Sequence, residues 1–437
     1  MARSASRRFT GATSAPSARP VWPPSDASPP CRRPGLPAMS AWGGRCMSSE
    51  SEGEMWAVGE EILHDGPPTP RSGSDPAARL DESCLVIDPQ AQAFFAREGA
   101  DTVGKCVGIA TILQAHGHVR EASEFYRRAC DLHDRSPGLT PAAHWLLQAR
   151  LLCLLKAGMT PPEAELSELR ALCIPYADYI EGVREAWQGG DVFNAVRTIG
   201  NAYEEFHTGE EIESILLGLV HRGMPGIFNG KPGGRNVSIP RKLFFYREKQ
   251  DLSPQVAENL SRYKDIRDLD VQIFNRDAAA EWLYAYYGVE ARSLFLEARH
   301  PGEAADFLGV HVINLLGGWW LDADIPLRTA AFRTLMDTPD RNGVYFLTDH
   351  DVIRNDFFGS TPNSEILVDC ILSLYRNSYL HKGLPVAGRT GPGIFGRAMN
   401  RLINRRLNGI VSHEMIAVLD HSQFRNVIEA VDPLHTV

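Results

Sequence analysis

The second half of the sequence alternates between short apolar runs and helical stretches, and this alternation limits the possible folds more than any other feature. Residues 239–246 (IPRKLFFY) and 269–274 (LDVQIF) have the short, mainly apolar pattern of strands. Residues 253–265 between them and 276–287 after them have the pattern of helices. Strands joined by helices through short connections predict right-handed parallel crossovers, and such sheets bind ligands at the carboxyl ends of their strands. We therefore expect an α/β domain over residues 239–437.

A third strand, residues 319–321 (WWL), is followed at once by two carboxylates, Asp322 and Asp324. In an extended segment, residues i and i+2 point to the same side, so these two side chains are predicted to converge while Ala323 points away. Like charges held together destabilise a fold unless a cation lies near them, and Mg²⁺ and Mn²⁺ favour oxygen ligands. The Asp-x-Asp pattern therefore predicts a metal site that bridges the protein and a diphosphate; a solvated loop is the alternative interpretation.

The sequence around this pair, residues 304–327 (AADFLGVHVINLLGGWWLDADIPL), resembles the core of the glycosyltransferase family whose sugar-binding region contains a DXD motif. That family includes the yeast-type initiating mannosyltransferases and, more distantly, the clostridial glucosylating toxins. Residues 239–246 are similar to its opening strand and residues 390–400 (TGPGIFGRAMN) to its T-G-P-G segment. The resemblance covers about residues 239–430 and implies a Rossmann-like nucleotide-diphospho-sugar transferase fold of the A type. The residues that match the DXD region are Asp306, Gly317, Gly318, Trp320, Leu321, Asp322, Ala323 and Asp324.

The resemblance implies a metal-dependent hexosyltransferase that retains the anomeric configuration. Asp322 and Asp324 would hold Mn²⁺ or Mg²⁺ against the diphosphate of a UDP- or GDP-sugar donor. Asp306 would accept hydrogen bonds from hydroxyl groups of the donor sugar. The local pattern alone fits equally well with Asp306 as a charge on the outer face of a helix.

Three further residues are candidates for donor contacts. Tyr246 closes the first strand and could lie against the nucleotide base, although an ordinary core aromatic is the simpler interpretation. Trp320 occupies the aromatic position of the DXD region. Asn355 stands where the family often has Asn after its third strand, so we expect it near the donor.

The chain departs from the family pattern at two places. The family usually has Arg three residues after its conserved Asp, where this chain has Gly309. Because Gly309 stands one helical turn from Asp306, we expect it to leave room beside the donor. The first strand normally carries His and Trp near its end, where this chain has Phe244 and Arg247.

Residues 86–220 are predicted to be helical. They contain an irregular repeat in which a glycine in a turn between two helices is followed by two alanines. Such units resemble the tetratricopeptide family, whose helical hairpins stack into a solenoid with a concave groove for a protein partner. A generic helical bundle is the alternative. Residues 221–238, rich in Gly and Pro, are predicted to be a linker. The three units are Gly117, Ala122 and Ala129; Gly158, Ala164 and Ala171; and Gly190, Ala195 and Ala202.

Residues 1–85 have a different composition, rich in Pro, Ser, Ala and Arg near the start. The low hydrophobicity predicts disorder. A start codon placed too early, with Met39 or Met47 as the true first residue, is an alternative, and so is a transit peptide. Repeated prolines argue against the amphipathic helix that a transit peptide needs.

Charge and cysteine usage exclude several classes of protein. The net charge of −9 argues against a general nucleic-acid binder. No apolar run approaches the roughly 20 residues that span a bilayer. The eight cysteines include no C-x-x-C pair, so neither a zinc site nor a dense disulfide framework is indicated. We expect a cytoplasmic protein without a transmembrane segment.

The sequence thus predicts a glycosyltransferase that moves a sugar from a nucleotide-sugar donor to an unknown glycan, protein or small-molecule acceptor. The alternative is a catalytically weak protein that binds a nucleotide-sugar and recruits a partner through its helices. Asp349, His350 and Asp351 could suggest a metal phosphoesterase instead. Consecutive strand residues point to opposite faces, however, which argues against a shared metal there.

Overall fold

The structure is a computed structural model that describes residues 85–133, 141–230, 237–248, 254–264 and 266–429. Almost all of the predicted N-terminal extension, up to residue 84, lies outside the described residues. The middle of the predicted linker, residues 231–236, also lies outside them. None of the described helices is both long and apolar enough to cross a lipid bilayer.

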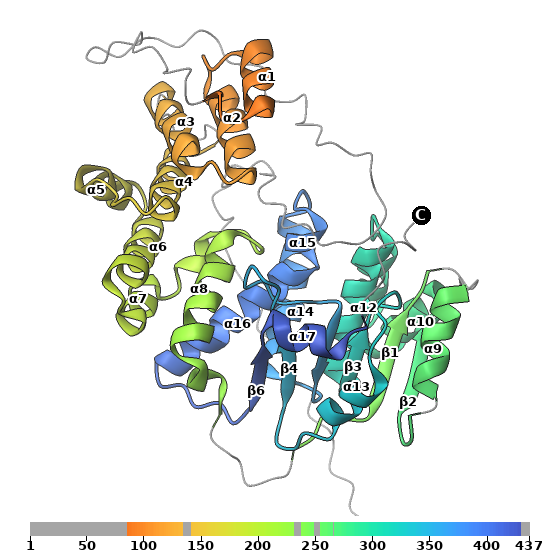
Figure 1. Ribbon diagram of the computed structural model, residues 1–437. Helices are drawn as coiled ribbons and strands as arrows, with labels where there is room; N and C mark the ends of the chain where they lie inside the picture. The colour runs from red at the N-terminus through yellow and green to blue at the C-terminus, as the bar shows by residue number, and fades with distance from the viewer. Residues whose placement is uncertain (1–84, 134–140, 231–236, 249–253, 265, 430–437) are drawn as a thin grey trace, which may run out of the picture. The chain divides into compact units, whose positions relative to one another are not determined.

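A six-stranded mixed sheet forms the centre of the second half of the chain, in the order β2-β1-β3-β5-β4-β6 (Figure 1). The pairs β1–β2, β1–β3 and β4–β6 are parallel, whereas β5 is antiparallel to both of its neighbours. The predicted parallel pairing of the first strands is therefore confirmed. The strands are β1 (Lys242–Tyr246), β2 (Asp270–Phe274), β3 (Gly318–Leu321), β4 (Gly343–Phe346), β5 (Phe357–Ser360) and β6 (Ile416–Leu419).

Strand β1 is apolar on both sides because the sheet separates two cores. Alternate residues of a strand face opposite sides of the sheet. Phe244 and Tyr246 accordingly belong to one buried cluster, and Leu243 and Phe245 belong to the other. Strand β2 lies at the edge of the sheet and is mostly exposed, so helices do not cover the whole sheet.

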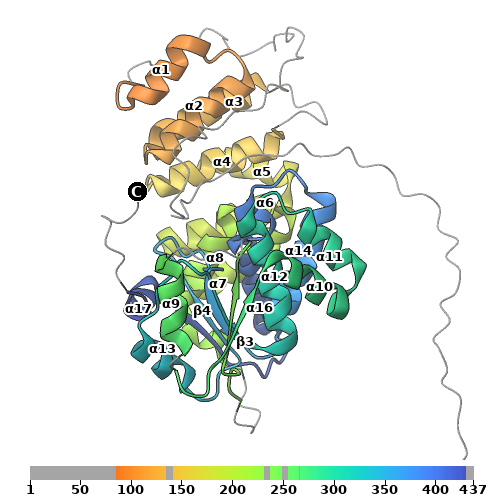
Figure 2. The same ribbon diagram turned by 90° about the vertical axis from the view of Figure 1, so that its right-hand side faces the viewer.

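Helices cover both faces of this sheet (Figure 2). The larger cluster includes residues of α12, α14 and α16, and the smaller one includes residues of α9, α13 and α17. The helices of this half are α9 (Pro254–Lys264), α10 (Arg276–Tyr287), α11 (Val289–Leu296), α12 (Pro301–Leu316), α13 (Thr329–Met336), α14 (Glu365–Leu380), α15 (Val386–Arg389), α16 (Pro392–Leu407) and α17 (His421–Val427).

Two glycines form the connection from α12 to β3. Gly317 caps the helix at a φ of 62°, and Gly318 begins the strand at a φ of 119°. Residues with side chains rarely adopt these angles. A Cβ on Gly318 would also lie 2.8 Å from the carbonyl oxygen of Lys242. The glycine pair thus lets the chain leave the helix and enter the sheet directly beside β1.

The first half of the chain is helical, as predicted. Gly117, Gly158 and Gly190 each follow the first helix of a pair, at φ values of 83°, 71° and 75°. Helix neighbours in the sequence pack against one another along this half. The elements are α1 (Pro89–Glu98), α2 (Val103–Ala115), α3 (Val119–Leu132), α4 (Ala143–Lys156), α5 (Glu163–Leu172), α6 (Ile174–Arg184), the π-helix η2 (Glu185–Gly189), α7 (Val192–Ile199), the 3-10 helix η3 (Ala202–Glu205), α8 (Glu211–Gly223) and the 3-10 helix η4 (Pro225–Phe228).

The alanines of the predicted repeat differ in burial from one unit to the next. The alanines of the first and third units are buried. In the middle unit Ala164 and Ala171 are exposed, and Leu166 and Leu169 are buried in their place. The extra residue in that turn shifts which side of α5 faces its neighbours, so the expectation of close helix approach through these alanines is wrong there. The resemblance to tetratricopeptide repeats stays a prediction.

Helix α8 packs against α16 through buried polar groups. The guanidinium of Arg397 donates to Glu213 at 2.6 Å, and both side chains are almost fully buried. Nearby, the hydroxyl of Thr208 donates to the carbonyl oxygen of Gly388 at 2.8 Å. Breaking such a buried pair on one side leaves an uncompensated charge, which typically costs about 3–5 kcal/mol. The position of the domain boundary at residues 221–238 stays a prediction. The two contacts join residues that precede this range to residues that follow it.

Candidate functional site

The two predicted metal ligands follow β3 at an edge where two strands with opposite directions meet. The backbone N–H of Asp322 donates to the carbonyl oxygen of Asp356 at 2.8 Å, which extends the β3–β5 ladder by one step. Because β5 is antiparallel to β3, the residues that precede β5 lie beside those that follow β3. Asp356 is a residue that sequence reasoning missed, because nothing in the sequence around it reveals the antiparallel pairing.

Asp322 and Asp324 do not belong to an extended segment. Strand β3 ends at Leu321, and the N–H of Ile325 donates to the carbonyl oxygen of Asp322 at 3.1 Å, which closes a turn. The prediction that the side chains of Asp322 and Asp324 converge was based on strand geometry, and that basis is wrong. Asp322 is half-buried, whereas Asp324 is exposed.

The electrostatic surroundings of Asp322 disfavour its charged form. Burial raises the pKa of Asp322 well above its usual range, and the neighbouring carboxylates of Asp356, Asp306 and Asp324 raise it further. The indole N–H of Trp320 donates to Asp322 at 3.2 Å and opposes this effect. Burial and Asp356 also raise the pKa of Asp324. Four carboxylates thus influence one small region, and added positive charge there would stabilise it.

Arg354 supplies positive charge to one of these carboxylates. Its guanidinium binds Asp356 through two nitrogens, one of them at 2.9 Å. The same guanidinium carbon lies 3.9 Å from the ring centroid of Phe424 in α17, a cation–π geometry. Arg354 is thereby held at Asp356, and the structure gives it no contact with Asp322 or Asp324.

Asp306 lies within the second turn of α12 and is held from two other parts of the chain. The side-chain N–H of Asn355 donates to its Oδ1 at 2.6 Å, and the hydroxyl of Thr390 donates to its Oδ2 at 3.0 Å. Burial raises the pKa of Asp306 to about 7, while these two hydrogen bonds lower it. Asp306 is half-buried and hydrogen-bonded, so it is not a charge on the outer face of a helix.

The segment that carries Thr390 is fixed to α12 by a second contact. Arg389 forms a buried ion pair with Glu303 at 2.8 Å. Arg299 also pairs with Glu303. Glu303 and Asp306 stand one turn apart in α12, so adjacent residues of one segment, Arg389 and Thr390, contact two successive turns of the helix. The segment at residues 390–400 therefore meets the segment at residues 306–324 through the contact of Thr390 with Asp306.

Gly309 does not leave room beside a ligand. A Cβ built there would lie 2.8 Å from two carbons of the Trp320 indole, so the ring fills the place of the missing side chain. Trp320 is 1% exposed. The expectation of a free space at Gly309 is wrong, and the reason for glycine is close packing of α12 against β3.

The other predicted donor contacts are buried aromatic groups. Tyr246 is 7% exposed and packs edge-on against Phe295, with ring centroids 5.8 Å apart. Trp320 belongs to the same buried cluster. A core role accounts for what these side chains touch, and their contact with a donor stays a prediction. Asn355, by contrast, lies directly at Asp306.

The phosphoesterase interpretation of residues 349–351 loses its basis. Asp349 and His350 are exposed, whereas Asp351 pairs with Arg222 of α8 at 2.7 Å. The backbone of Asp351 has a φ of 59°, which marks a tight turn rather than a strand. These three side chains are therefore not arranged around a common centre.

The residues near β3 suit a divalent metal that takes some of its ligands from a substrate. Among the described residues, no group of three or more His, Cys, Asp or Glu side chains has the arrangement to hold a metal ion. Mg²⁺ is commonly held by one or two carboxylates together with substrate phosphates. The unfavourable charge around Asp322 is what such an ion would offset. Asp322 and Asp324 are the residues that would hold it.

Comparisons with known proteins give little further guidance. No protein-family model matches the sequence, and no curated protein matches it. Among solved structures, the chain is similar to one described as "PaToxG Glycosyltransferase", with 12% identity over 50% of this chain and 94% of that chain. The TM-score of that likeness is 0.31, which supports no conclusion about function.

Proposed function

We propose that this protein is a metal-dependent glycosyltransferase that uses a nucleotide-sugar donor. The observation that carries the proposal is the meeting of Asp306, Asn355 and Thr390 beside Asp322 at the carboxyl end of β3. These residues come from four separate parts of the chain. Asp306, Asp322 and Thr390 lie in the two stretches, residues 304–327 and 390–400, where the sequence resembles the DXD glycosyltransferases, and α/β sheets bind ligands at this edge.

Asp306 is suited to orient the donor sugar. Each of its carboxylate oxygens accepts one hydrogen bond from the protein, and each retains a lone pair for a further donor. Sugar hydroxyl groups are such donors. Because Asn355 and Thr390 fix both oxygens, Asp306 would bind those hydroxyls with little loss of side-chain freedom.

Asp322 and Asp324 would hold the metal against the diphosphate. A divalent ion supplies Lewis-acid stabilisation to the nucleotide as it leaves. The indole of Trp320 orients Asp322 through its N–H, and Arg354 holds Asp356 in place next to it through hydrogen bonds. A UDP- or GDP-sugar as donor and retention of configuration are what the resemblance implies.

The test compares donor binding in the wild type and in an Asp322→Asn/Asp324→Asn variant. Thermal shifts with a panel of UDP- and GDP-sugars, with and without Mn²⁺, report binding because a ligand of the native state raises stability by mass action. We expect a Mn²⁺-dependent shift for the wild type and none for the double variant. Asp349→Asn, a matched change in an exposed loop, should behave like the wild type.

The outcome also separates the enzyme from a non-catalytic binding protein. Release of free nucleotide from the donor that gives the largest shift would show turnover. A Mn²⁺-dependent shift without any release, over hours and with the candidate acceptors, would favour the weak nucleotide-sugar-binding protein instead. Undiminished Mn²⁺-dependent binding in the double variant would remove Asp322 and Asp324 from the site.

A further inference from the structure

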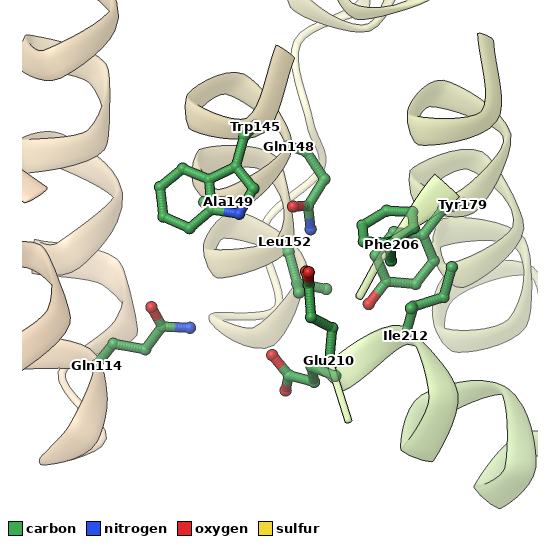
Figure 3. Close-up of a pocket in the computed structure, with 10 residues that line it drawn as sticks. Gln114, Trp145, Gln148, Ala149, Leu152, Tyr179, Phe206, Glu210 and Ile212 are labelled. Carbon is green, nitrogen blue, oxygen red and sulfur yellow. The ribbon is translucent and has the colours of Figure 1, made fainter. Parts of the chain in front are cut away.

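A cavity in the helical half of the chain has a chemistry unlike that of the sheet edge (Figure 3). It lies among α2, α4, α6 and the start of α8, and shares no residue with the Asp306–Asp322 site. About 350 Å³ of empty space lies at this place, but most of the room for a ligand is in its opening to solvent, and the enclosed part holds a group about the size of a water molecule. An ammonium group has that size, and a chain attached to it can leave through the opening.

Two adjacent carboxylates, Glu210 and Glu211, line this cavity. Glu210 accepts a hydrogen bond from the backbone N–H of His207 at 2.9 Å through Oε1. Glu211 pairs with Lys156 at 2.5 Å, again through Oε1. Within the described part of the chain, the buried Oε2 of Glu211 accepts no hydrogen bond. Glu211 therefore has a cation, whereas no ion pair joins Glu210 to a described residue, and acceptor capacity remains on both carboxylates.

A buried hydroxyl also lacks a partner at this place. Tyr179 lines the cavity, is 1% exposed, and makes no hydrogen bond through its hydroxyl to any described residue. Figure 3 shows its ring extending from α6 toward the space between α4 and α8. A buried polar group without a partner destabilises the fold, so a ligand that hydrogen-bonds to it recovers part of that loss.

The unused acceptors indicate the kind of group that fits. They are the remaining lone pairs of the Glu210 carboxylate, Oε2 of Glu211 and the hydroxyl oxygen of Tyr179. A primary ammonium has three N–H donors and no acceptor, which matches this set in number and in charge. An anion would be repelled by both carboxylates, and a neutral ligand would leave the charge of Glu210 uncompensated.

The remaining walls suit an aliphatic chain attached to that ammonium. Trp145 and Leu152 of α4, together with Phe206, contribute apolar surface to the cavity. Methylene groups of such a chain are removed from water where they meet this surface, which favours binding.

The protonation of Glu210 is consistent with a missing positive charge. The pKa of Glu210 is raised to about 7, mainly by burial and also by the neighbouring carboxylate of Glu213. The N–H of His207 and the charge of Arg397 oppose this shift. Arg397 is itself engaged by Glu213 at 2.6 Å. Within the described residues, the structure therefore gives Glu210 no cation of its own.

We propose that the cavity formed by α4, α6 and α8 binds a primary ammonium at the end of an aliphatic chain, with Glu210, Glu211 and Tyr179 as its acceptors. The ammonium can be that of a lysine side chain in a protein partner or that of a free diamine. This binding does not depend on the glycosyl transfer proposed above, because the two sites share no residue.

Isothermal titration calorimetry of the full-length protein tests the proposal with two probes, cadaverine and Nα-acetyl-lysine N-methylamide. Pentanol serves as the neutral comparison of similar length. We expect saturable binding of at least one amine and none of the alcohol. Tighter binding of the lysine derivative would identify a protein lysine as the source, and tighter binding of cadaverine would identify a free amine.

Matched variants connect the binding to the proposed acceptors. Glu210→Gln keeps the shape of the side chain and removes its charge, so the affinity should fall at least tenfold. Tyr179→Phe removes only the hydroxyl and should weaken binding about threefold to tenfold. Glu205→Gln, an exposed carboxylate of η3 that does not line the cavity, should leave the affinity unchanged.

Two results would overturn the proposal. The first is the absence of saturable binding of either amine at millimolar concentration. The second is equal amine affinity in the wild type and Glu210→Gln, which would place the amine elsewhere on the protein. Because Glu210 precedes α8 and is only partly buried, its amide variant should fold, and circular dichroism with a thermal melt verifies this.

Discussion

The hydroxyl of Thr390 donates a hydrogen bond to Oδ2 of Asp306 at 3.0 Å, although the two residues are 84 positions apart in the sequence. Asn355 donates to the other oxygen of the same carboxylate. Asp306 is therefore fixed by two neutral donors, and burial keeps its pKa at about 7. A carboxylate held in this way has its oxygens oriented to accept hydrogen bonds from a ligand. Burial disfavours its charged form, and hydrogen bonds from a ligand would offset that destabilisation.

The first prediction concerns the charge of Asp306. In Asp306→Asn, the amide oxygen can accept from Asn355 while the amide N–H₂ donates to the hydroxyl oxygen of Thr390, so the geometry should persist. Loss of a charged acceptor should weaken donor binding about tenfold to a hundredfold, measured by calorimetry with Mn²⁺. Asp277→Asn, a matched change in the first turn of α10, should have no effect. Equal donor affinity in Asp306→Asn and the wild type would show that Asp306 does not face the sugar.

The second prediction tests whether the hydroxyl group of Thr390 or the shape of its side chain matters for the site. Thr390→Val keeps the branched side chain but leaves Oδ2 of Asp306 without its donor, whereas Thr390→Ser keeps the hydroxyl. We expect Val to lower kcat/KM for the donor about threefold to tenfold and Ser to restore most of it, since one hydrogen bond is removed and then returned. A positioning role predicts this rescue. Similar losses in both variants would mean that packing of Thr390, not its hydroxyl, is what matters.

The third prediction concerns the packing of Gly309 against Trp320. In Gly309→Ala the new Cβ would lie 2.8 Å from two carbons of the Trp320 indole, which is closer than such atoms pack. Either the helix or the ring must therefore move. Overpacking should lower the free energy of unfolding by about 1–3 kcal/mol, partly offset by the better helix propensity of Ala. Urea unfolding measures this change. Movement of the ring should also weaken Mn²⁺-dependent donor binding, because Trp320 orients Asp322.

Gly104→Ala is the control for that experiment. Gly104 lies in α2, and a Cβ there would meet nothing within 4 Å. Its substitution should raise the free energy of unfolding by about 0.5–1 kcal/mol through helix propensity alone. If Gly309→Ala also stabilised the protein, the close contact between α12 and β3 would not constrain that position.

The fourth prediction concerns pH and a carboxylate remote from the site. Burial raises the pKa of Glu414 from 4.5 to about 7; the N–H of Glu365 and the guanidinium groups of Arg406 and Arg405 oppose the shift. The folded state therefore binds more protons than the unfolded state between these values, and stability falls as the pH rises through this window. Glu414→Gln removes that loss. We expect the variant to gain stability relative to the wild type from about pH 4.5 to about pH 8, by at most roughly 3 kcal/mol.

Urea unfolding at several pH values measures this difference directly. Other carboxylates with raised pKa values, such as Asp306 and Glu210, are present in both proteins and cancel in the comparison. A difference between the variant and the wild type that is constant with pH would show that Glu414 titrates normally in the folded state.

Local pattern was sufficient to predict several elements of this protein. The runs that became β1, β2 and β3 lie where the sequence places them, and the glycine pair stands between α12 and β3. Each is determined by features within a few residues: apolar and β-branched side chains in strands, and glycines at positive φ where helices end. The parallel pairing of β1 with β2 follows because a helix separates them.

Only the tertiary structure decided how the site is assembled. The antiparallel insertion of β5 beside β3 brings Asp356 next to Asp322, and the approach of the segment after α15 to α12 brings Thr390 to Asp306. Gly309 likewise became interpretable only when Trp320 was seen to occupy its place. These contacts join residues that are distant in the sequence, and they form because the buried faces of different elements pack together. Sequence periodicity records which face of an element is buried, but not which partner covers it.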